Sequence, residues 1–143
     1  MKQFVIDTNA LLSFVTDRNS DQQEFMNTIF EMVSSAKAAL LCPQNVIAEF
    51  VYVMETIYNQ PKTLIRSIIA DFVLLPGVTI DEKTDIKTVF SLWPEQVEDF
   101  GDAIVAACAA SHKGSIVITF DRRFIRSLKA RYIPFRTLKQ SKS

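Results

Sequence analysis

The chain has few of the residues on which several common kinds of active site depend. Its three glycines are too scattered for a Gly-rich phosphate-binding loop, and its single histidine, His112, excludes a site built from several histidines. Cys42 and Cys108 lie far apart in apolar surroundings, which favours buried free thiols over a zinc site or a disulfide. No apolar run approaches the roughly 20 residues that span a bilayer, and Asp7 comes too early for a signal peptide. We therefore expect a cytoplasmic protein.

The length and composition are those of one folded domain. The chain has 143 residues, of which 48% are hydrophobic and 22% charged. It shows no internal repeat, no low-complexity segment and no linker. We expect a single domain over residues 1–138 and a disordered tail over 139–143.

The net charge is zero, but the charges are unevenly distributed. Residues 1–112 carry 15 acidic and 7 basic side chains, whereas residues 113–143 carry Asp121 against 9 basic ones. This asymmetry is typical of a protein that binds an anionic partner near its C-terminus. A solvated helix surface and tail also explain it, and charge alone favours that explanation.

Apolar periodicity predicts strands and helices that alternate along the chain. Strands are expected over residues 3–6, 39–42, 78–80, 115–119 and 133–135. Helices are expected over residues 8–15, 21–37, 43–58, 61–73, 83–92, 99–111 and 122–129. Strands separated by helices indicate an α/β fold of three layers, with a mostly parallel central sheet of about five short strands.

Two aspartates follow predicted strands directly. Asp7 ends the first strand in FVIDTN, and Asp121 follows the strand in SIVITF. Functional groups gather at the carboxyl ends of strands in open α/β sheets, so these two carboxylates are expected to lie close together.

Three further acids belong to predicted helices. Asp99 and Asp102 open a helix of small residues, where either one also fits the role of a cap. Glu49 has apolar neighbours in NVIAEFVYVM and is expected to be at least partly buried, with a partner. A salt bridge would supply that partner, but no basic residue lies within one helical turn of Glu49.

If Asp7, Glu49, Asp102 and Asp121 converge, their mutual repulsion raises their pKa values, and a hard divalent cation removes that cost. Oxygen ligands favour Mg²⁺ or Mn²⁺ over zinc. Such a site suits phosphoryl chemistry and needs no histidine base.

These residues, in this order and spacing, resemble the PIN-domain ribonucleases, and among them the VapC-like toxins of toxin–antitoxin pairs. The resemblance runs from FVIDTNALLSFV through NVIAEFVYVM and DFGDAIVAA to VITFDRRF. It implies a PIN-like fold and Mg²⁺- or Mn²⁺-dependent cleavage of RNA that leaves a 5′-phosphate and a 3′-hydroxyl. It also implies a partner antitoxin.

The resemblance carries over to individual positions. Asp7, Glu49, Asp102 and Asp121 match the catalytic, metal-holding acids. Asp99 matches an additional acid that is often found one turn earlier. Polar positions beside the acids, expected to orient the carboxylates, are matched by Thr8, Asn9 and Thr119. Thr8 or Asn9 also fits the role of a cap for the helix after Asp7.

Further expectations concern partners. Arg122, Arg123 and Arg126 flank the proposed site and are candidates for binding RNA phosphates, although helix solubility also explains them. Phe14, Phe25, Phe30 and Phe50 are more than one small core is expected to bury, which indicates a homodimer interface or an antitoxin groove.

Two other functions remain open. A PIN-like domain can be a non-catalytic module that binds RNA or protein, although this chain retains all its acids. An aspartyl-phosphate enzyme would need a lysine after a strand end, and none lies in that context.

Overall fold

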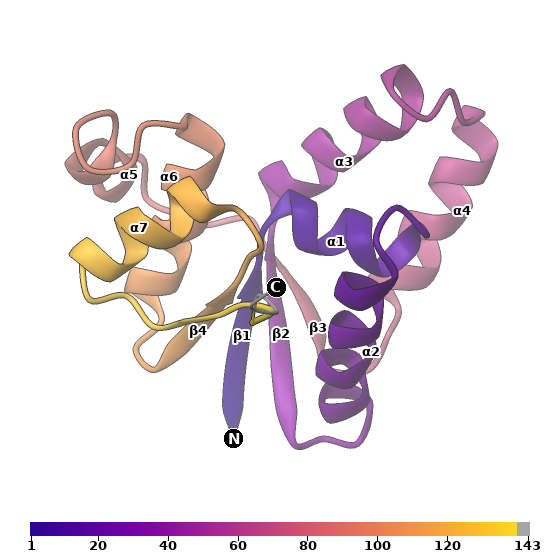
Figure 1. Cartoon of the computed structure of the whole chain (residues 1–143), viewed down its shortest axis with the longest axis horizontal. Coiled ribbons are helices and arrows are strands. Elements are labelled where there is room, and N and C mark those ends of the chain that lie inside the picture. The colour runs from indigo at the N-terminus through magenta and orange to yellow at the C-terminus, as the bar shows by residue number, and fades with distance from the viewer. Residues whose placement is uncertain (140–143) are drawn as a thin grey trace.

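The computed structural model describes residues 1–139 and shows one sheet of five strands (Figure 1). Of the tail expected over 139–143, residues 140–143 lie outside the described part. The strands are β1 (Lys2–Ile6), β2 (Ala38–Pro43), β3 (Val78–Asp81), β4 (Ser115–Ile118) and β5 (Phe135–Arg136). Their order is β3-β2-β1-β4-β5, and all four pairings are parallel. The α/β prediction is confirmed.

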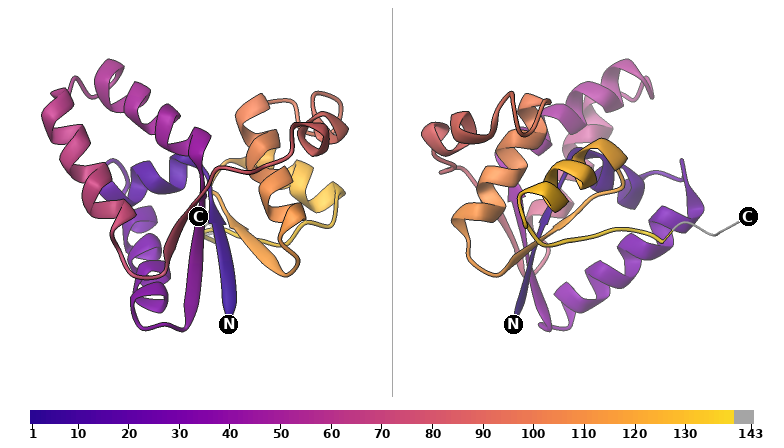
Figure 2. Two further views of the ribbon diagram at one scale, coloured as in Figure 1. Left: turned by 180° about the vertical axis from the view of Figure 1, so that it is seen from behind. Right: turned by 60° about the vertical axis from the view of Figure 1, so that its left-hand side comes forward.

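Helices cover both faces of this sheet. They are α1 (Thr8–Val15), α2 (Ser20–Ser34), α3 (Gln44–Thr56), α4 (Lys62–Val73), α5 (Ile86–Leu92), α6 (Phe100–Ser111) and α7 (Arg122–Ala130). Helices α1, α2 and α4 lie on one side, and α5, α6 and α7 lie on the other (Figures 1 and 2). Helix α3 rises from the carboxyl end of β2, beyond the edge of the sheet (Figure 1).

The central strands are buried on both faces, as their continuous apolar sequences require. Phe4, Val5 and Ile6 of β1 have no exposed surface, and neither do Val117 and Ile118 of β4. The small residues of α6 let that helix lie close against β1, β2 and β4.

Some element ends differ from the prediction. Helix α2 stops at Ser34 rather than at 37, because Ala36 takes a left-handed conformation with φ of 61°. Helix α5 begins at Ile86 rather than at 83, because Asp85 caps it and Asp81 holds the preceding loop through Thr84. The last strand, β5, lies at 135–136 rather than at 133–135.

Of the four phenylalanines expected to exceed what the core can bury, Phe30 and Phe50 are buried, and Phe14 and Phe25 are half-buried. Phe50 is completely buried, and Phe30 stacks on Phe14 with ring centroids 3.7 Å apart. Phe25 packs edge-on against Phe120. The Phe14–Phe30 stack joins α1 to α2. Within residues 1–139, no helix is both long enough and apolar enough to cross a membrane.

Candidate active site

The strand order reverses at β1, and the predicted acids gather there. From β1 the chain moves outward to β2 and β3, then returns to the other side of β1 to form β4 and β5. Ile6 pairs with Ile118, so Asp7 and Thr119 leave neighbouring strands at the same level. A reversal of this kind leaves a crevice at the carboxyl ends of the strands, where α/β proteins bind ligands.

Asp7 occupies the floor of this crevice. Asp7 is 3% exposed, and its carboxylate caps α1 by accepting the Ala10 N–H at 2.8 Å. The other carboxylate oxygen accepts the Thr119 hydroxyl. Burial raises the pKa of Asp7 to about 6, although these two hydrogen bonds oppose the rise. The negative charge of Asp121 raises this pKa further.

Thr119 connects Asp7 to Asp121. The Thr119 hydroxyl is completely buried and accepts the Asp121 N–H at 3.1 Å while it donates to Asp7. The Asp121 carboxylate caps α7 by accepting the N–H groups of Arg123 and Phe124. One hydroxyl therefore fixes the positions of two of the predicted acids.

Glu49 is exposed, which corrects the expectation of a partly buried carboxylate. Val46, Phe50 and Met54 are the buried residues of α3, and Glu49 lies beside that stripe and lines the crevice. The Thr8 hydroxyl donates to Glu49 Oε2 at 2.6 Å. No basic side chain within residues 1–139 forms an ion pair with Glu49. The salt-bridge alternative is therefore wrong.

Asp99 and Asp102 lie at the start of α6. Asp99 is the cap, since it accepts the Asp102 N–H at 2.9 Å. The pKa of Asp102 is raised to about 8, first by burial and then by the negative charges of its neighbours. These neighbours are Asp99, Asp7, Asp121 and Glu49. The other four predicted acids therefore all lie close enough to act on Asp102.

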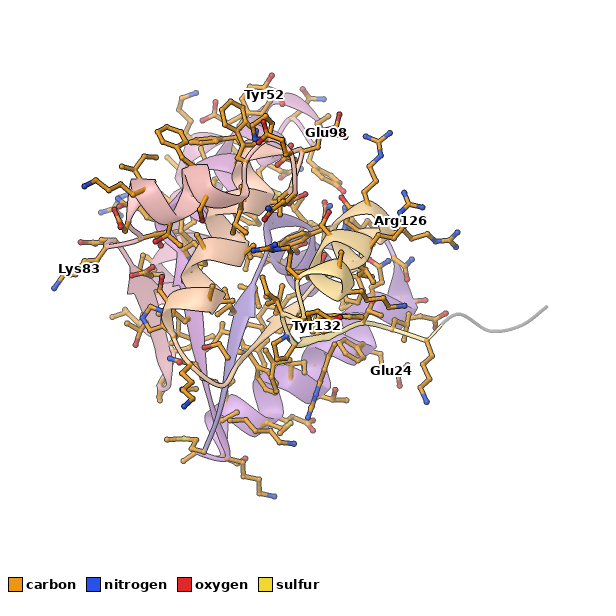
Figure 3. The ribbon with its side chains drawn as sticks, turned by 90° about the vertical axis from the view of Figure 1, so that its left-hand side faces the viewer. Glu24, Tyr52, Lys83, Glu98, Arg126 and Tyr132 are labelled. Carbon is orange, nitrogen blue, oxygen red and sulfur yellow. The ribbon has the colours of Figure 1, made fainter. Side chains whose placement is uncertain are left out.

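A single cavity of about 270 Å³ contacts all five acids. Its lining residues come from α1, α3, α6 and the end of β4 and are Asp7, Thr8, Asn9, Leu12, Glu49, Tyr52, Val53, Asp99, Gly101, Asp102, Val105 and Asp121. We call it the acidic cavity. The exposed ring of Tyr52, labelled in Figure 3, stands at its outer edge.

The model of the PIN domain family matches residues 4–127, which is most of the chain. This chain belongs to the PIN domain family. A similar protein is the VapC ribonuclease of Aquifex aeolicus (strain VF5), which is 25% identical over 120 residues. That alignment covers 84% of this chain and 88% of the relative. The resemblance stated from the sequence is confirmed.

A solved structure supports the same fold. The crystal structure of VapBC2 from Rickettsia felis, bound to a DNA fragment from their promoter, matches with a TM-score of 0.70. The match covers 96% of this chain and 99% of the other at 12% identity. At that identity the likeness concerns the fold alone.

The arginines predicted beside the PIN-domain acids line two neighbouring hollows. Arg123 and Arg126 contact a hollow of about 630 Å³ that also touches Asp99, Asp102 and Asp121. Arg122 and Arg126 contact a larger groove, of about 1210 Å³, between α2 and α7. We call this second hollow the α2–α7 groove.

The predicted polar neighbours differ in their contacts. Thr8 and Thr119 each donate a hydrogen bond to a carboxylate. The cap of α1 is Asp7 rather than Thr8 or Asn9. The Asn9 side chain instead accepts from Arg18, and no hydrogen bond joins it to an acid among the described residues.

Sequence reasoning missed two residues of the site. Gly101 is one: a Cβ built on it would stand 2.2 Å from Glu49 Oε1, so only glycine leaves this carboxylate its place. Its position between Asp99 and Asp102 was the available signal. Arg18 is the other, and the sequence carried no signal for it because a loop brings it back to Asn9.

Proposed function

We propose that this PIN domain is a metal-dependent endoribonuclease that hydrolyses RNA phosphodiester bonds and acts as the toxin of a toxin–antitoxin module. The observation that carries the proposal is the convergence of five carboxylates on the acidic cavity, from α3, the start of α6 and the segments that follow β1 and β4. Like charges are brought together in this way where a cation is to be held. The ribonuclease named among the relatives supports the reaction class.

The donor set fits Mg²⁺ or Mn²⁺. It consists of carboxylate oxygens, the ligands that these cations prefer. Asp7, Glu49, Asp102 and Asp121 would hold the metal, with Asp99 as a further ligand. No three His, Cys, Asp or Glu side chains of residues 1–139 already stand in a metal-binding arrangement, so ligation requires side-chain adjustment. Once bound, the cation supplies an activated water and stabilises negative charge on the phosphate.

The remaining polar residues have supporting roles in this proposal. Thr119 and Thr8 orient Asp7 and Glu49 through their hydroxyl groups, and Asn9 lines the cavity beside them. Arg122, Arg123 and Arg126 would attract RNA phosphates to the hollows beside the acids.

The biological setting is also part of the proposal. The VapBC2 complex among the similar structures supports an antitoxin as the partner of this chain. Free, buried cysteines are consistent with the reducing conditions of the cytoplasm. We retain the homodimer as a proposal, although the phenylalanine set that suggested it packs inward.

Cleavage of total cellular RNA tests the function. The purified chain, freed of any small protein that co-purifies, is incubated with Mg²⁺, with Mn²⁺ or with EDTA. Asp7→Asn is compared with Asp71→Asn, a matched change at an exposed position on α4. We expect discrete fragments with either metal, none with EDTA or Asp7→Asn, and full activity for Asp71→Asn.

Two other results would refute this function. RNA binding by both variants without cleavage would identify a non-catalytic binding module. Cleavage that persists in EDTA and in Asp7→Asn would show that the reaction does not depend on the five acids.

A further inference from the structure

Arg18 is an arginine held in place without a carboxylate partner. It follows α1, and its side chain turns back along that helix. Nε donates to Ser13 Oγ at 2.9 Å, and Nη2 donates to the Asn9 carbonyl at 3.0 Å. Nη1 lies 3.5 Å from Asn9 Oδ1. Among residues 1–139, no acid forms an ion pair with Arg18. Its positive charge nevertheless acts on the acidic cavity, because it lowers the pKa of Asp7.

The anchor of Arg18 is itself fixed. Ser13 is completely buried, and its hydroxyl donates to Gln22 Oε1 at 2.7 Å. The guanidinium therefore belongs to a chain of hydrogen bonds that runs from α2 to the start of α1. An arginine that is ordered before binding loses little conformational entropy when it receives an anion.

Arg18 stands between the two hollows that matter for a long substrate. Asn9, which Arg18 contacts, lines the acidic cavity. Asn19 and Gln22, on its other side, line the α2–α7 groove. Arg18 therefore lies next to residues of both hollows.

The α2–α7 groove has the features of a path for single-stranded nucleic acid. Its walls carry the basic residues Arg122, Arg126 and Lys139 against the acids Asp21 and Glu24. Figure 3 shows Glu24 and Arg126 on the same side of the molecule, and Figure 2 shows the C-terminal segment running toward α2.

The floor of the groove is aromatic. Phe25 and Phe120 are both half-buried there, and their rings meet edge to face with centroids 5.7 Å apart. Aromatic rings stack on bases while basic side chains hold the phosphates, which is how sequence-tolerant single-strand grooves bind.

We propose that Arg18 binds a phosphate of the RNA strand beside the scissile bond, and that this strand continues along the α2–α7 groove. The inference rests on the proposed ribonuclease function. It makes Arg18 a substrate-binding residue and Ser13 the residue that positions it. The basic side chains and the aromatic pair of the groove favour RNA over a protein segment as the occupant, and Arg126 also lines the hollow that touches Asp99, Asp102 and Asp121.

Equilibrium binding of a short, fluorescent single-stranded RNA of mixed sequence tests the proposal. All proteins carry Asp102→Asn, which blocks cleavage and lies away from Arg18. Arg18→Gln is compared with Arg66→Gln, an equal loss of charge on α4, on the far side of the sheet from α7 (Figure 1). KCl is varied between about 50 and 200 mM.

We expect Arg18→Gln to weaken RNA binding about tenfold and to lower the salt slope by about 0.7, the value for one phosphate contact on a single strand. Arg18→Lys should restore the slope but only part of the affinity, because it keeps the charge and loses the planar fork. Ser13→Ala should weaken binding less and leave the slope unchanged. Thermal unfolding verifies that each variant is folded.

In the active background, Arg18→Gln should raise KM for RNA more than it lowers kcat. An affinity and slope equal to those of Arg66→Gln would overturn the proposal. So would a loss confined to kcat, which would show that Arg18 acts through Asp7. Unchanged RNA binding with weakened binding of a co-purifying antitoxin would assign the groove to a protein and also overturn it. Metal-dependent cleavage alongside any of these results would leave the ribonuclease function standing.

Discussion

The Glu49 carboxylate occupies the space that a side chain at Gly101 would need. A Cβ at position 101 would lie 2.2 Å from Glu49 Oε1 and 3.2 Å from Asp99 Oδ1. The nearest obstacle is the end of a flexible side chain, so the backbone can keep its place while Glu49 moves. The absence of a side chain at Gly101 thus leaves room for Glu49 of α3 beside the acids at the start of α6.

Gly101→Ala should therefore lower activity without lowering stability. Glu49 is displaced, so we expect RNA cleavage to fall at least about tenfold and metal affinity to fall with it. Alanine favours a helix over glycine by about 1 kcal/mol, so the melting temperature should be unchanged or higher. Nuclease assays and thermal unfolding measure the two effects.

A double-mutant cycle shows whether Gly101 acts through Glu49. Added to Glu49→Gln, the Gly101→Ala change should cost little further activity, because the group it displaces no longer ligates. Fully additive losses would mean that Gly101 serves some other contact.

Thr119→Val should damage both acids that this hydroxyl holds. The variant keeps the shape of the side chain but removes the bond to Asp7 and leaves the Asp121 N–H unpaired. Because that bond lowers the pKa of Asp7, its loss raises this pKa further. We expect a loss of about 1–3 kcal/mol in the free energy of unfolding and a rate profile displaced to higher pH. Thr119→Ser, which keeps the hydroxyl, is the control.

Sequence patterns predicted the positions of the acids well, for physical reasons. A strand buried on both faces must be continuously apolar, so Asp7 and Asp121 could be recognised as the first charged residues beyond β1 and β4. Periodicity gave most helices within a few residues. The ends that differed depend on a left-handed Ala36 and on the loop around Asp81, which periodicity does not encode.

The contacts between elements could not be predicted in the same way. Glu49 looked buried because its sequence neighbours are apolar, but exposure depends on where α3 stands relative to the sheet. Arg18 reaches Asn9 only because the chain reverses after α1. Phe14 and Phe30 stack on each other across two helices, which removed the outer face that their number suggested.

The two cysteines should be unreactive in the folded protein. Burial raises the pKa of both the Cys42 and the Cys108 thiols to about 12, so almost no thiolate exists at pH 8. We expect no alkylation by iodoacetamide in native buffer and labelling of both residues in denaturant, as read by mass spectrometry. Rapid labelling of either native residue would mean that the fold opens locally around it.

The raised pKa values in the acidic cavity determine how stability depends on pH. In the fold the pKa of Asp7 is raised to about 6 and that of Asp102 to about 8, against an ordinary value of 3.8. Between pH 4 and pH 8 the folded protein therefore holds more protons at these two sites than the unfolded chain. The free energy of unfolding must then fall as the pH rises through this window.

Thermal unfolding in EDTA at pH 5 and pH 8 measures this loss, which we expect to be on the order of 2 kcal/mol. Asp102→Asn places no negative charge in the acidic cavity at position 102. This variant should therefore show a flatter pH dependence of stability and be more stable than the parent at pH 8. Mg²⁺ should raise the melting temperature of the parent at pH 8 much more than at pH 5, since the ionised carboxylates are its ligands. An equal Mg²⁺ effect in Asp102→Asn would place the cation outside the acidic cavity.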